Sequence, residues 1–352
     1  MREEPLVSVV IASYNGEKYI HDQILSILGQ TYTNLEIIVV DDKSTDDTTG
    51  IAKKLAKKDN RIKVFENERN LGITRNFLKG LSYAHGEFIC FCDQDDYWMK
   101  DKIVILKKLI EKGNNNTLVY SDMEICDERL HVIHDSFWKT SAIMPRNGHV
   151  GNRSFLRNIM PGCSMMFRRE VVNLIRDKET TLSLMHDHLI FILSSLLGDI
   201  VYTKKKLVKY RQHDKNNIGA FYVSSVDNHK IIKNLKEAID YFRSNIKGIK
   251  DLNLEKLESF CRCMNSGGIF QRLLFSKYYL FLRNDTIKDK FLGFFECLAP
   301  TFYSWLRSIH KNSNCLSWLA RITFIAWVFV ASFFFIKEFI FCKIIKFLGY
   351  IR

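Results

Sequence analysis

Three carboxylates fall within four positions directly after an apolar run. Residues 89–92, Ile-Cys-Phe-Cys, have the composition of a buried strand end, and Asp93, Asp95 and Asp96 follow them. Carboxylates this close together repel one another, and a bound cation cancels that repulsion. Hard oxygen ligands suit Mg²⁺ or Mn²⁺, and ions held in this way commonly bridge to the phosphates of a substrate. The cluster therefore predicts a divalent metal site, and the alternative interpretation is a solvated acidic turn.

Two more polar clusters follow apolar runs nearer the N-terminus. Residues 7–12 and 35–40 are rich in β-branched apolar side chains, which is typical of fully buried strands. The first run ends in the turn-forming segment 13–17, and the second runs into Asp41 and Asp42. Polar residues therefore follow three predicted strands at the point where each strand ends.

The segments between these strands carry apolar residues at helical spacing. The expected elements are a helix at 19–28, a helix starting near residue 46 that Ser44 or Thr45 caps, a strand at 61–65 and a helix at 73–85. Alternating strands and helices imply a parallel sheet with right-handed crossovers. Because ligands bind beyond the carboxyl ends of such strands, we expect the three polar clusters to converge on one rim.

Four motifs in the first hundred residues together resemble the inverting family 2 glycosyltransferases. They are Val-Ser-Val-Val-Ile-Ala-Ser-Tyr-Asn-Gly-Glu at 7–17, Val-Val-Asp-Asp-Lys-Ser-Thr-Asp at 39–46, Asn-Leu-Gly-Ile-Thr-Arg-Asn at 70–76 and Phe-Cys-Asp-Gln-Asp-Asp-Tyr-Trp at 91–98. The resemblance implies an α/β GT-A fold with a mostly parallel, Rossmann-like central sheet flanked by helices. It also implies a nucleotide-sugar donor and a divalent metal. The last motif is most similar to the bacterial rhamnosyltransferase-like branch.

The resemblance assigns donor-binding roles to residues of the first three motifs. Tyr14 and Asp42 are expected to stack on and hydrogen-bond the base, and Arg75 to lean on the base or the phosphates. Relatives usually read Pro-Thr before this tyrosine, and Ser13 keeps the hydroxyl at that place. Two alternatives stand beside these roles: an N-cap-type role for Asp42 and a solvated helix face for Arg75.

Metal-binding roles fall on the fourth motif and on a histidine far along the chain. By the resemblance, Asp93 contacts the ribose or the metal, and Asp95 is the main metal ligand. Relatives carry Tyr-Arg-x-His where this chain has residues 210–213, which implies that His213 reaches the metal or the diphosphate. The alternative for His213 is a solvated loop side chain.

The second half of the chain must supply the acceptor site. Residues 158–168, Asn-Ile-Met-Pro-Gly-Cys-Ser-Met-Met-Phe-Arg, form a turn that enters an apolar run. In relatives a segment of this type lines the sugar-binding and acceptor pocket. The residues expected in the acceptor region are Gly162, Cys163, Ser164, Asp96 and Trp98.

Residues 186–188, His-Asp-His, open an apolar helix that runs to residue 197. In the family an Asp at this place takes the proton from the acceptor hydroxyl. The resemblance thus makes Asp187 the general base, a role worth roughly two to four orders of magnitude in rate. Attack from behind the leaving group inverts the sugar carbon. The alternatives are a helix cap formed by Asp187 and a zinc site formed by the two histidines, although no further ligands have zinc-like spacing.

The composition agrees with an enzyme that handles anionic substrates. The 352 residues carry a net charge of +13, which suits a nucleotide donor, a pyrophosphate-linked acceptor or an anionic membrane surface. A nucleic-acid partner is not expected, because the sequence has no zinc-finger spacing or RNA-recognition signature. Nine scattered cysteines argue against a disulfide framework. The N-terminal residues do not read as a signal peptide, so the catalytic portion is expected in the cytoplasm.

The sequence changes character after residue 226. We expect a catalytic domain at 1–225 and a helical C-terminal region at 226–352. Residues 316–336 are strongly apolar but short for a membrane span, and lysines alternate with phenylalanines after them. This pattern favours a peripheral or shallow anchor at the cytoplasmic face of the membrane over a single span. The alternative is a helical pair that packs on the catalytic domain or on a second subunit.

The resemblance implies a metal-dependent, inverting transferase that adds one sugar to a glycan or polyprenyl-linked acceptor in bacterial surface polysaccharide (O-antigen or capsule) synthesis. The motifs point to dTDP-rhamnose as the donor, with a UDP-sugar as the alternative. Processive relatives carry Gln-x-x-Arg-Trp, which this sequence lacks. Two other classes are a sugar nucleotidyltransferase, which needs a different loop after the first strand, and a non-catalytic membrane-bound scaffold. The joint presence of Asp93, Asp95, Asp187 and His213 argues against the scaffold.

Overall fold

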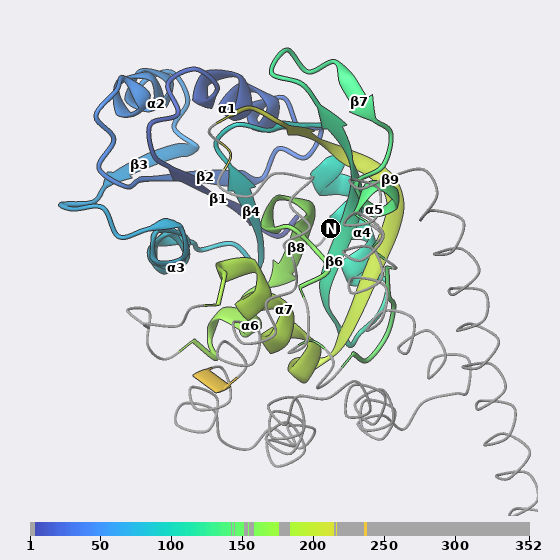
Figure 1. Cartoon of the computed structure of the whole chain (residues 1–352). Coiled ribbons are helices and arrows are strands. Elements are labelled where there is room, and N and C mark those ends of the chain that lie inside the picture. The colour runs from blue at the N-terminus through green and yellow to red at the C-terminus, as the bar shows by residue number, and fades with distance from the viewer. Residues whose placement is uncertain are drawn as a thin grey trace, which may run out of the picture. The chain divides into compact units, whose positions relative to one another are not determined.

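The computed structural model describes residues 4–141, 143, 145–150, 154, 158–175, 184–214, 216 and 236–237. One nine-stranded sheet runs through these residues in the order β3-β2-β1-β4-β8-β6-β9-β5, with β7 beside β6 (Figure 1). Apart from 236–237, the predicted C-terminal region, including the expected anchor at 316–336, lies outside the described residues. Among the described residues, no helix has both the length and the apolar character that crossing a membrane requires.

Four parallel strands form the N-terminal half of the sheet, as the apolar runs predict. They pair in the order β3-β2-β1-β4. Helices α1 and α2 cover one face of these strands and α3 covers the other (Figure 1). The bounds are β1 Val7–Ser13, α1 Ile20–Leu28, β2 Leu35–Asp41, α2 Thr48–Ala56, β3 Ile62–Glu66, α3 Ile73–Tyr83 and β4 Phe88–Asp93.

The register of these strands brings their polar ends to one edge. Ser13 pairs with Asp41 across β1 and β2, and Ala12 pairs with Asp93 across β1 and β4. The carboxyl ends of parallel strands meet at the same edge, so the residues that follow them share a rim. The predicted convergence of the three polar clusters is confirmed.

The second half of the sheet is mixed. Strand β8 runs antiparallel to both β4 and β6, β5 is antiparallel to β9, and β6 is parallel to β9. The prediction of a mostly parallel sheet is therefore wrong beyond β4. Antiparallel strands need no crossover helix, so the sequence holds no helical segment that would indicate their direction. The bounds are β5 Tyr97–Trp98, α4 Lys102–Glu111, β6 Asn116–Cys126, β7 Val132–His134, α5 Phe137–Thr140, η2 Gly162–Ser164, β8 Met165–Arg168, α6 Arg169–Val172, α7 His186–Leu197 and β9 Asp199–Arg211.

The start of α2 differs from the prediction. The helix begins at Thr48 and its N-terminus has no side-chain cap. Ser44 instead donates from its N–H and its hydroxyl to the Asp41 carboxylate, at 2.8 and 2.6 Å. The Ser44 hydroxyl also accepts the N–H of Asn15 at 2.9 Å, and Thr45 N–H donates to the Asn15 side chain at 2.8 Å. These polar side chains join the turns after β1 and β2 rather than cap a helix.

Aromatic side chains fill the core beneath the rim. Phe77 of α3, Phe91 of β4 and Phe167 of β8 are fully buried. The ring centroids of Phe77 and Phe91 lie 4.8 Å apart, and those of Phe91 and Phe167 lie 5.1 Å apart, both at tilted angles that aromatic pairs favour. This packing holds the end of β4, from which the acidic cluster projects, against both halves of the sheet.

Candidate active site

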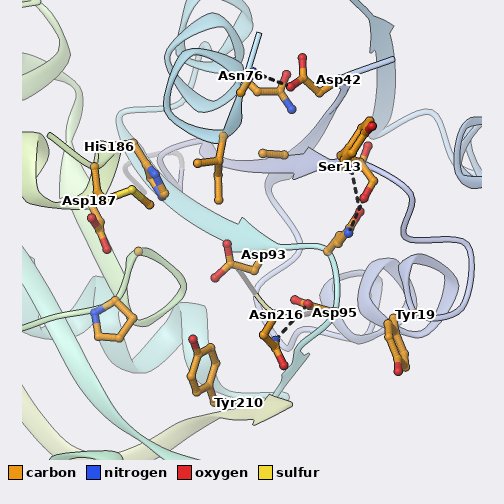
Figure 2. A pocket seen from close by; sticks show the side chains of 18 of the residues that line it. Ser13, Tyr19, Asp42, Asn76, Asp93, Asp95, His186, Asp187, Tyr210 and Asn216 are labelled. Atoms are coloured by element: carbon orange, nitrogen blue, oxygen red, sulfur yellow. Dashed lines mark hydrogen bonds between the residues drawn. The ribbon is translucent and has the colours of Figure 1, made fainter. Parts of the chain in front are cut away.

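A cavity of about 1170 Å³ lies at the carboxyl ends of the N-terminal strands. It gathers side chains from segments that are far apart in the sequence, as Figure 2 shows for several of them. The predicted site residues that line it are Ser13, Tyr14, Asp42, Asp93, Asp95, Gly162, Asp187 and His213. The remaining predicted residues, discussed below, lie elsewhere.

The turn after β1 is held from beneath. The Ser13 hydroxyl donates to the Asp41 carboxylate at 3.0 Å, so this hydroxyl supports the turn. Tyr14 is 48% exposed at the cavity wall, which leaves its ring available for stacking on a flat ligand. The predicted donor-binding role of Tyr14 fits this place.

Asp42 organises the loop that leads into α3. Its carboxylate is buried and accepts the side-chain amide of Asn67 at 2.7 Å and the N–H groups of Leu71 and Gly72, each at 2.8 Å. Gly72 adopts φ 81°, a conformation that favours glycine. Asp42 therefore fixes the neighbouring loop and faces the cavity at the same time. It does not cap α2, the helix that follows it.

Gln94 clamps the turn after β1 to the acidic cluster. Its side-chain carbonyl accepts the N–H of Tyr14 at 2.9 Å, and its amide donates to the carbonyl of Tyr14 at 3.0 Å. A Cβ on Gly16 would lie 2.1 Å from the Gln94 side-chain oxygen, so only glycine leaves room for the clamp. The sequence analysis missed this role. The signal was an amide, which both donates and accepts, placed between two carboxylates.

Asp95 meets the end of β9. Its Oδ2 lies 2.8 Å from His213 Nε2, and the Asn216 amide approaches the same oxygen at 3.4 Å. The Asp95 backbone carbonyl accepts the Arg211 guanidinium at 2.7 Å. The ring of His213 stacks on Tyr19 with centroids 4.7 Å apart. The chain thus brings Asp95 and His213 into contact, although 118 positions separate them.

The acidic cluster is crowded. Burial, together with the charges of Asp95 and Asp187, raises the pKa of Asp93 to about 7. Burial and the charges of Asp95 and Asp93 raise the pKa of Asp96 well above its usual range, even though Asp96 accepts the N–H of Arg211 at 3.1 Å. Ligand atoms of Asp93, Asp96 and Cys163 all lie within 4.8 Å of one another.

The donor set fits a hard divalent cation. Carboxylate oxygens such as those of Asp93 and Asp95 are ligands that Mg²⁺ and Mn²⁺ accept. Among the described residues, however, the three ligand atoms that lie within 4.8 Å of one another come from Asp93, Asp96 and Cys163, and not from Asp95 and His213. Burial, and after it the charges of Asp95 and Asp187, raises the pKa of Asp93, and a bound cation would offset that repulsion. The residues present therefore suit the metal that the resemblance implies.

Asp187 lies on the cavity wall in the first turn of α7. Burial raises its pKa to about 6, although hydrogen bonds from the His188 N–H, the Asn158 side chain and the Gly162 N–H favour the charged form. The His188 N–H lies 2.7 Å from Asp187 Oδ1. Met185 occupies the N-cap position, but the Asp187 carboxylate still accepts an N–H group of the first turn, as the capping interpretation expects. The start of a helix also favours a negative charge at this place.

The two flanking histidines do not form a zinc site. His188 Nε2 lies 2.7 Å from the Ser154 carbonyl, whereas His186 stacks on Phe77 with ring centroids 3.9 Å apart. Within the part of the chain that the structure describes, neither histidine belongs to a group of three metal-ligating side chains.

Four residues predicted in the acceptor region do not line the cavity. Trp98 is 1% exposed in the core, because its short strand turns Tyr97 outward and Trp98 inward, beneath the Lys102 ammonium 3.2 Å from its ring centroid. Asp96, Cys163 and Ser164 are fully buried, and of the three residues of η2 only Gly162 lines the cavity. The sequence located these segments but did not show which side chains face inward.

Arg75 also lies away from the cavity lining. It occupies the first turn of α3, half-exposed, and is not among the residues that line the cavity. Lining residues that the sequence analysis did not propose include Tyr19, Gln94, Glu128, His186, Tyr210 and Asn216. They lie on helices and strand ends that reach the cavity only through the tertiary packing, which the sequence pattern does not show.

The chain matches the family model described as Glycosyl transferase family 2 over residues 8–175. An uncharacterized glycosyltransferase of Haemophilus influenzae is 30% identical over 285 residues, which are 79% of this chain and 87% of that protein. The crystal structure of Staphylococcus aureus TarS 1–349 in complex with UDP-GlcNAc aligns with a TM-score of 0.52 at 20% identity, covering 78% of this chain and 80% of that one. The structural likeness shows a GT-A-like fold.

Two further relatives carry more specific names. The Escherichia coli enzyme WfgD, a UDP-Glc:alpha-D-GlcNAc-diphosphoundecaprenol beta-1,3-glucosyltransferase, is 40% identical over 123 residues, 35% of this chain and 47% of that protein. The putative teichuronic acid biosynthesis glycosyltransferase TuaG of Bacillus subtilis is 45% identical over 100 residues, 28% of this chain and 40% of that protein. These two matches span less than half of each relative. The long Haemophilus match and the family model together establish that the chain belongs to glycosyltransferase family 2.

Proposed function

We propose that this chain is a metal-dependent, inverting glycosyltransferase that moves one sugar from a nucleoside diphosphate to an acceptor hydroxyl. The observation that carries the proposal is that Asp187, Asp93, Asp95 and Tyr14 all line one cavity. In the view of Figure 2, Asp93 lies between Asp187 on one side and Ser13 on the other. A donor held between them would expose its sugar carbon to the Asp187 side.

The donor half of the cavity binds and orients the nucleotide sugar. The Tyr14 ring stacks on the base, and Asp42 and Gln94 hold the loops around it in place. Asp93, Asp95 and His213 would hold the divalent ion, which when bound neutralises charge growing on the diphosphate leaving group. The Asp95–His213 contact of 2.8 Å keeps both side chains at the place where the diphosphate arrives.

Asp187 acts as the general base. Its carboxylate accepts the proton of the acceptor hydroxyl while that oxygen bonds to the sugar carbon and the bond to the diphosphate oxygen breaks. Attack from the side opposite the leaving group inverts the carbon. With a pKa of about 6, Asp187 is mostly ionised at neutral pH yet more basic than an ordinary carboxylate.

For the substrates we propose a UDP-sugar ahead of dTDP-rhamnose, and a polyprenyl-linked or glycan acceptor in bacterial surface polysaccharide synthesis. The names of WfgD and TuaG support this choice, since one specifies UDP-glucose with a diphosphoundecaprenol acceptor and the other a cell-surface polymer. The net charge of +13 suits work at the anionic cytoplasmic face of a membrane. We assign residues 1–225 to catalysis and 226–352 to membrane association.

A donor panel tests the proposal. The full chain is incubated with UDP-glucose, UDP-GlcNAc, GDP-mannose and dTDP-rhamnose, with Mn²⁺ or with a chelator, and release of the nucleoside diphosphate is followed. We expect slow hydrolysis of one donor that depends on the metal and falls in Asp187→Asn. Binding of none of these donors, with or without Mn²⁺, would overturn the assignment.

A further inference from the structure

Lys102, the first residue of α4, is fully buried although lysine normally carries a charge. The residue is 0% exposed. Burial lowers the pKa of its ammonium, which reflects the free energy that removing this charge from water costs. Lysine is almost never fully buried, and an apolar side chain of similar volume is often as stabilising at such a place. The stability of the fold alone therefore does not account for this lysine.

The Lys102 side chain ties α4 to η2. Its Nζ donates to the backbone carbonyl of Cys163, the middle residue of η2, at 2.5 Å. Nζ also lies 3.2 Å from the ring centroid of Trp98, a cation–π contact. Trp98 is held in turn, because its backbone N–H donates to the hydroxyl of Ser26 in α1 at 3.1 Å. A strong, charge-assisted hydrogen bond thus reaches from a fixed helix to a short turn.

The η2 turn contacts the proposed general base. The N–H of Gly162 donates to the Asp187 carboxylate, and both residues line the cavity. A Cβ on Gly162 would lie 3.4 Å from the Cβ of Asp187, so the turn lies directly against the first turn of α7. Ser164 closes η2, since its N–H and its hydroxyl donate to the Pro161 carbonyl at 3.0 and 2.7 Å. A displacement of η2 would therefore be passed on to Asp187.

Resting on the proposed function, we infer that Lys102 is a positioning residue for the transfer reaction. Its hydrogen bond to the Cys163 carbonyl fixes η2, and η2 fixes the Asp187 carboxylate where it takes the acceptor proton. Lys102 is not among the residues that line the cavity, so it acts through the turn and not on the substrates. Misplacing a catalytic group by about 1 Å can lower a rate by roughly 100-fold, which sets the scale of the effect.

The charge of Lys102 has a second effect, on the acidic cluster. It favours the ionised form of Asp93, although less strongly than burial opposes that form. Two uncharged replacements distinguish the two effects. Lys102→Met keeps an unbranched side chain but removes both the charge and the donor. Lys102→Gln also removes the charge, yet it keeps an N–H donor for the Cys163 carbonyl.

Turnover and binding of both variants are measured on the full chain in Mn²⁺. Turnover uses whichever of UDP-glucose, UDP-GlcNAc, GDP-mannose and dTDP-rhamnose wild type hydrolyses, and calorimetry gives the affinity for the matching nucleoside diphosphate. We expect kcat of Lys102→Met to fall about tenfold to 100-fold and Lys102→Gln to recover most of it. Nucleoside diphosphate affinity should differ between the two variants by less than about twofold, because both lack the charge. Lys108→Met, at an exposed position of α4 outside the cavity lining, is the matched control and should keep both properties.

Hydrogen exchange of residues 158–168 tests the turn independently of activity. We expect faster exchange there in Lys102→Met than in wild type or Lys102→Gln. Equal exchange in all three proteins would overturn the inference. So would a kcat of Lys102→Gln as low as that of Lys102→Met, which would make the charge on the acidic cluster the cause.

Two further outcomes are distinguishable. Should Lys102→Met fail to fold, Lys102→Gln decides alone: wild-type turnover and exchange support the inference, and a folded variant with a tenfold lower kcat overturns it. Wild-type protein that hydrolyses none of the four donors would instead contradict the proposed function. The role of Lys102 at Asp187 would then fall with it, whatever the exchange of the turn.

Discussion

The two sides of the cavity treat their polar groups differently. On the donor side, Asp41 and Asp42 accept hydrogen bonds from neighbouring hydroxyls, amides and N–H groups, and the loops they hold are fully tied. On the reaction side, burial raises the pKa of Asp187, and the ring nitrogens of His186 lack a hydrogen-bond partner within the part of the chain that the structure describes. The hydrogen bonds that hold these donor-side loops are thus already formed without a ligand. The reaction side keeps unsatisfied groups, which is where binding energy can be directed to the chemical step.

Asp187→Asn is the strongest test of this contrast. The amide keeps the shape of the side chain but cannot take a proton, so we expect the transfer rate to fall by roughly two to four orders of magnitude. Donor affinity, measured by calorimetry, should stay within about twofold, because the donor side does not depend on Asp187. Undiminished turnover would remove Asp187 as the base, and a large loss of donor affinity would contradict the separation of the two sides.

Asp95→Ala probes the boundary between the two sides. It removes one carboxylate from the proposed metal set and the partner of His213 Nε2. Since metal coordination of a diphosphate is worth several kcal/mol, we expect nucleotide affinity in Mn²⁺ to fall on the order of 100-fold. In a chelator the variant and wild type should bind nucleotide alike. An unchanged Mn²⁺ dependence of nucleotide affinity would refute the role of Asp95. Glu68→Ala, at an exposed position outside the cavity lining, is the control.

Lowering the pH should reduce the transfer rate by protonating Asp187. A base must be ionised, and a pKa of about 6 means that the protonated fraction of Asp187 grows as the pH falls through 6. We expect kcat/KM at pH 5 to be about tenfold below its neutral plateau. Titrating nucleotide at each pH separates this limb from loss of donor binding. The residual activity of Asp187→Asn should lack the limb; its persistence there would assign the limb to another group.

The smallest effect is expected at the Gln94 clamp. Gln94→Ala breaks both hydrogen bonds to Tyr14, which frees the turn that presents the stacking ring. We expect nucleotide affinity to fall by about fivefold to tenfold. Gly16→Ala should reproduce the defect, because its Cβ would occupy the place of the Gln94 oxygen. The double variant should then be no worse than either single one, and additive losses would show that the clamp is not their shared cause.

The donor side was predictable because its signals are local. Buried β-branched runs, the polar residues that follow them and the parallel order all appear in consecutive sequence, so Tyr14, Asp42 and Asp93 were placed correctly on the rim. For His213, 118 positions away from Asp95, only the family resemblance indicated a place near the acidic cluster. Ser44 was misread because a serine near a helix start has two uses, a cap and a support for the preceding strand end.

The reaction side was less predictable because its geometry is non-local. Whether Trp98, Asp96 or Cys163 faces the cavity depends on how β5 and η2 pack, and neither short segment has a periodicity that shows its inward face. The antiparallel course of β8 left no helix in the sequence to mark it. The unpaired nitrogens of His186 are visible only once Phe77, Phe91 and Gly162 surround them.

The pairing of strand β8 bears on how the substrate specificity of this fold can change. Because β8 pairs with β4 on one side and β6 on the other, continuous hydrogen bonding joins the N-terminal strands to the second half of the sheet. Moving one half of the sheet relative to the other would break the backbone hydrogen bonds of β8, so the sheet beneath the cavity is expected to stay rigid. A change of substrate specificity is therefore expected from substitutions of side chains on the rim, with the sheet itself unchanged.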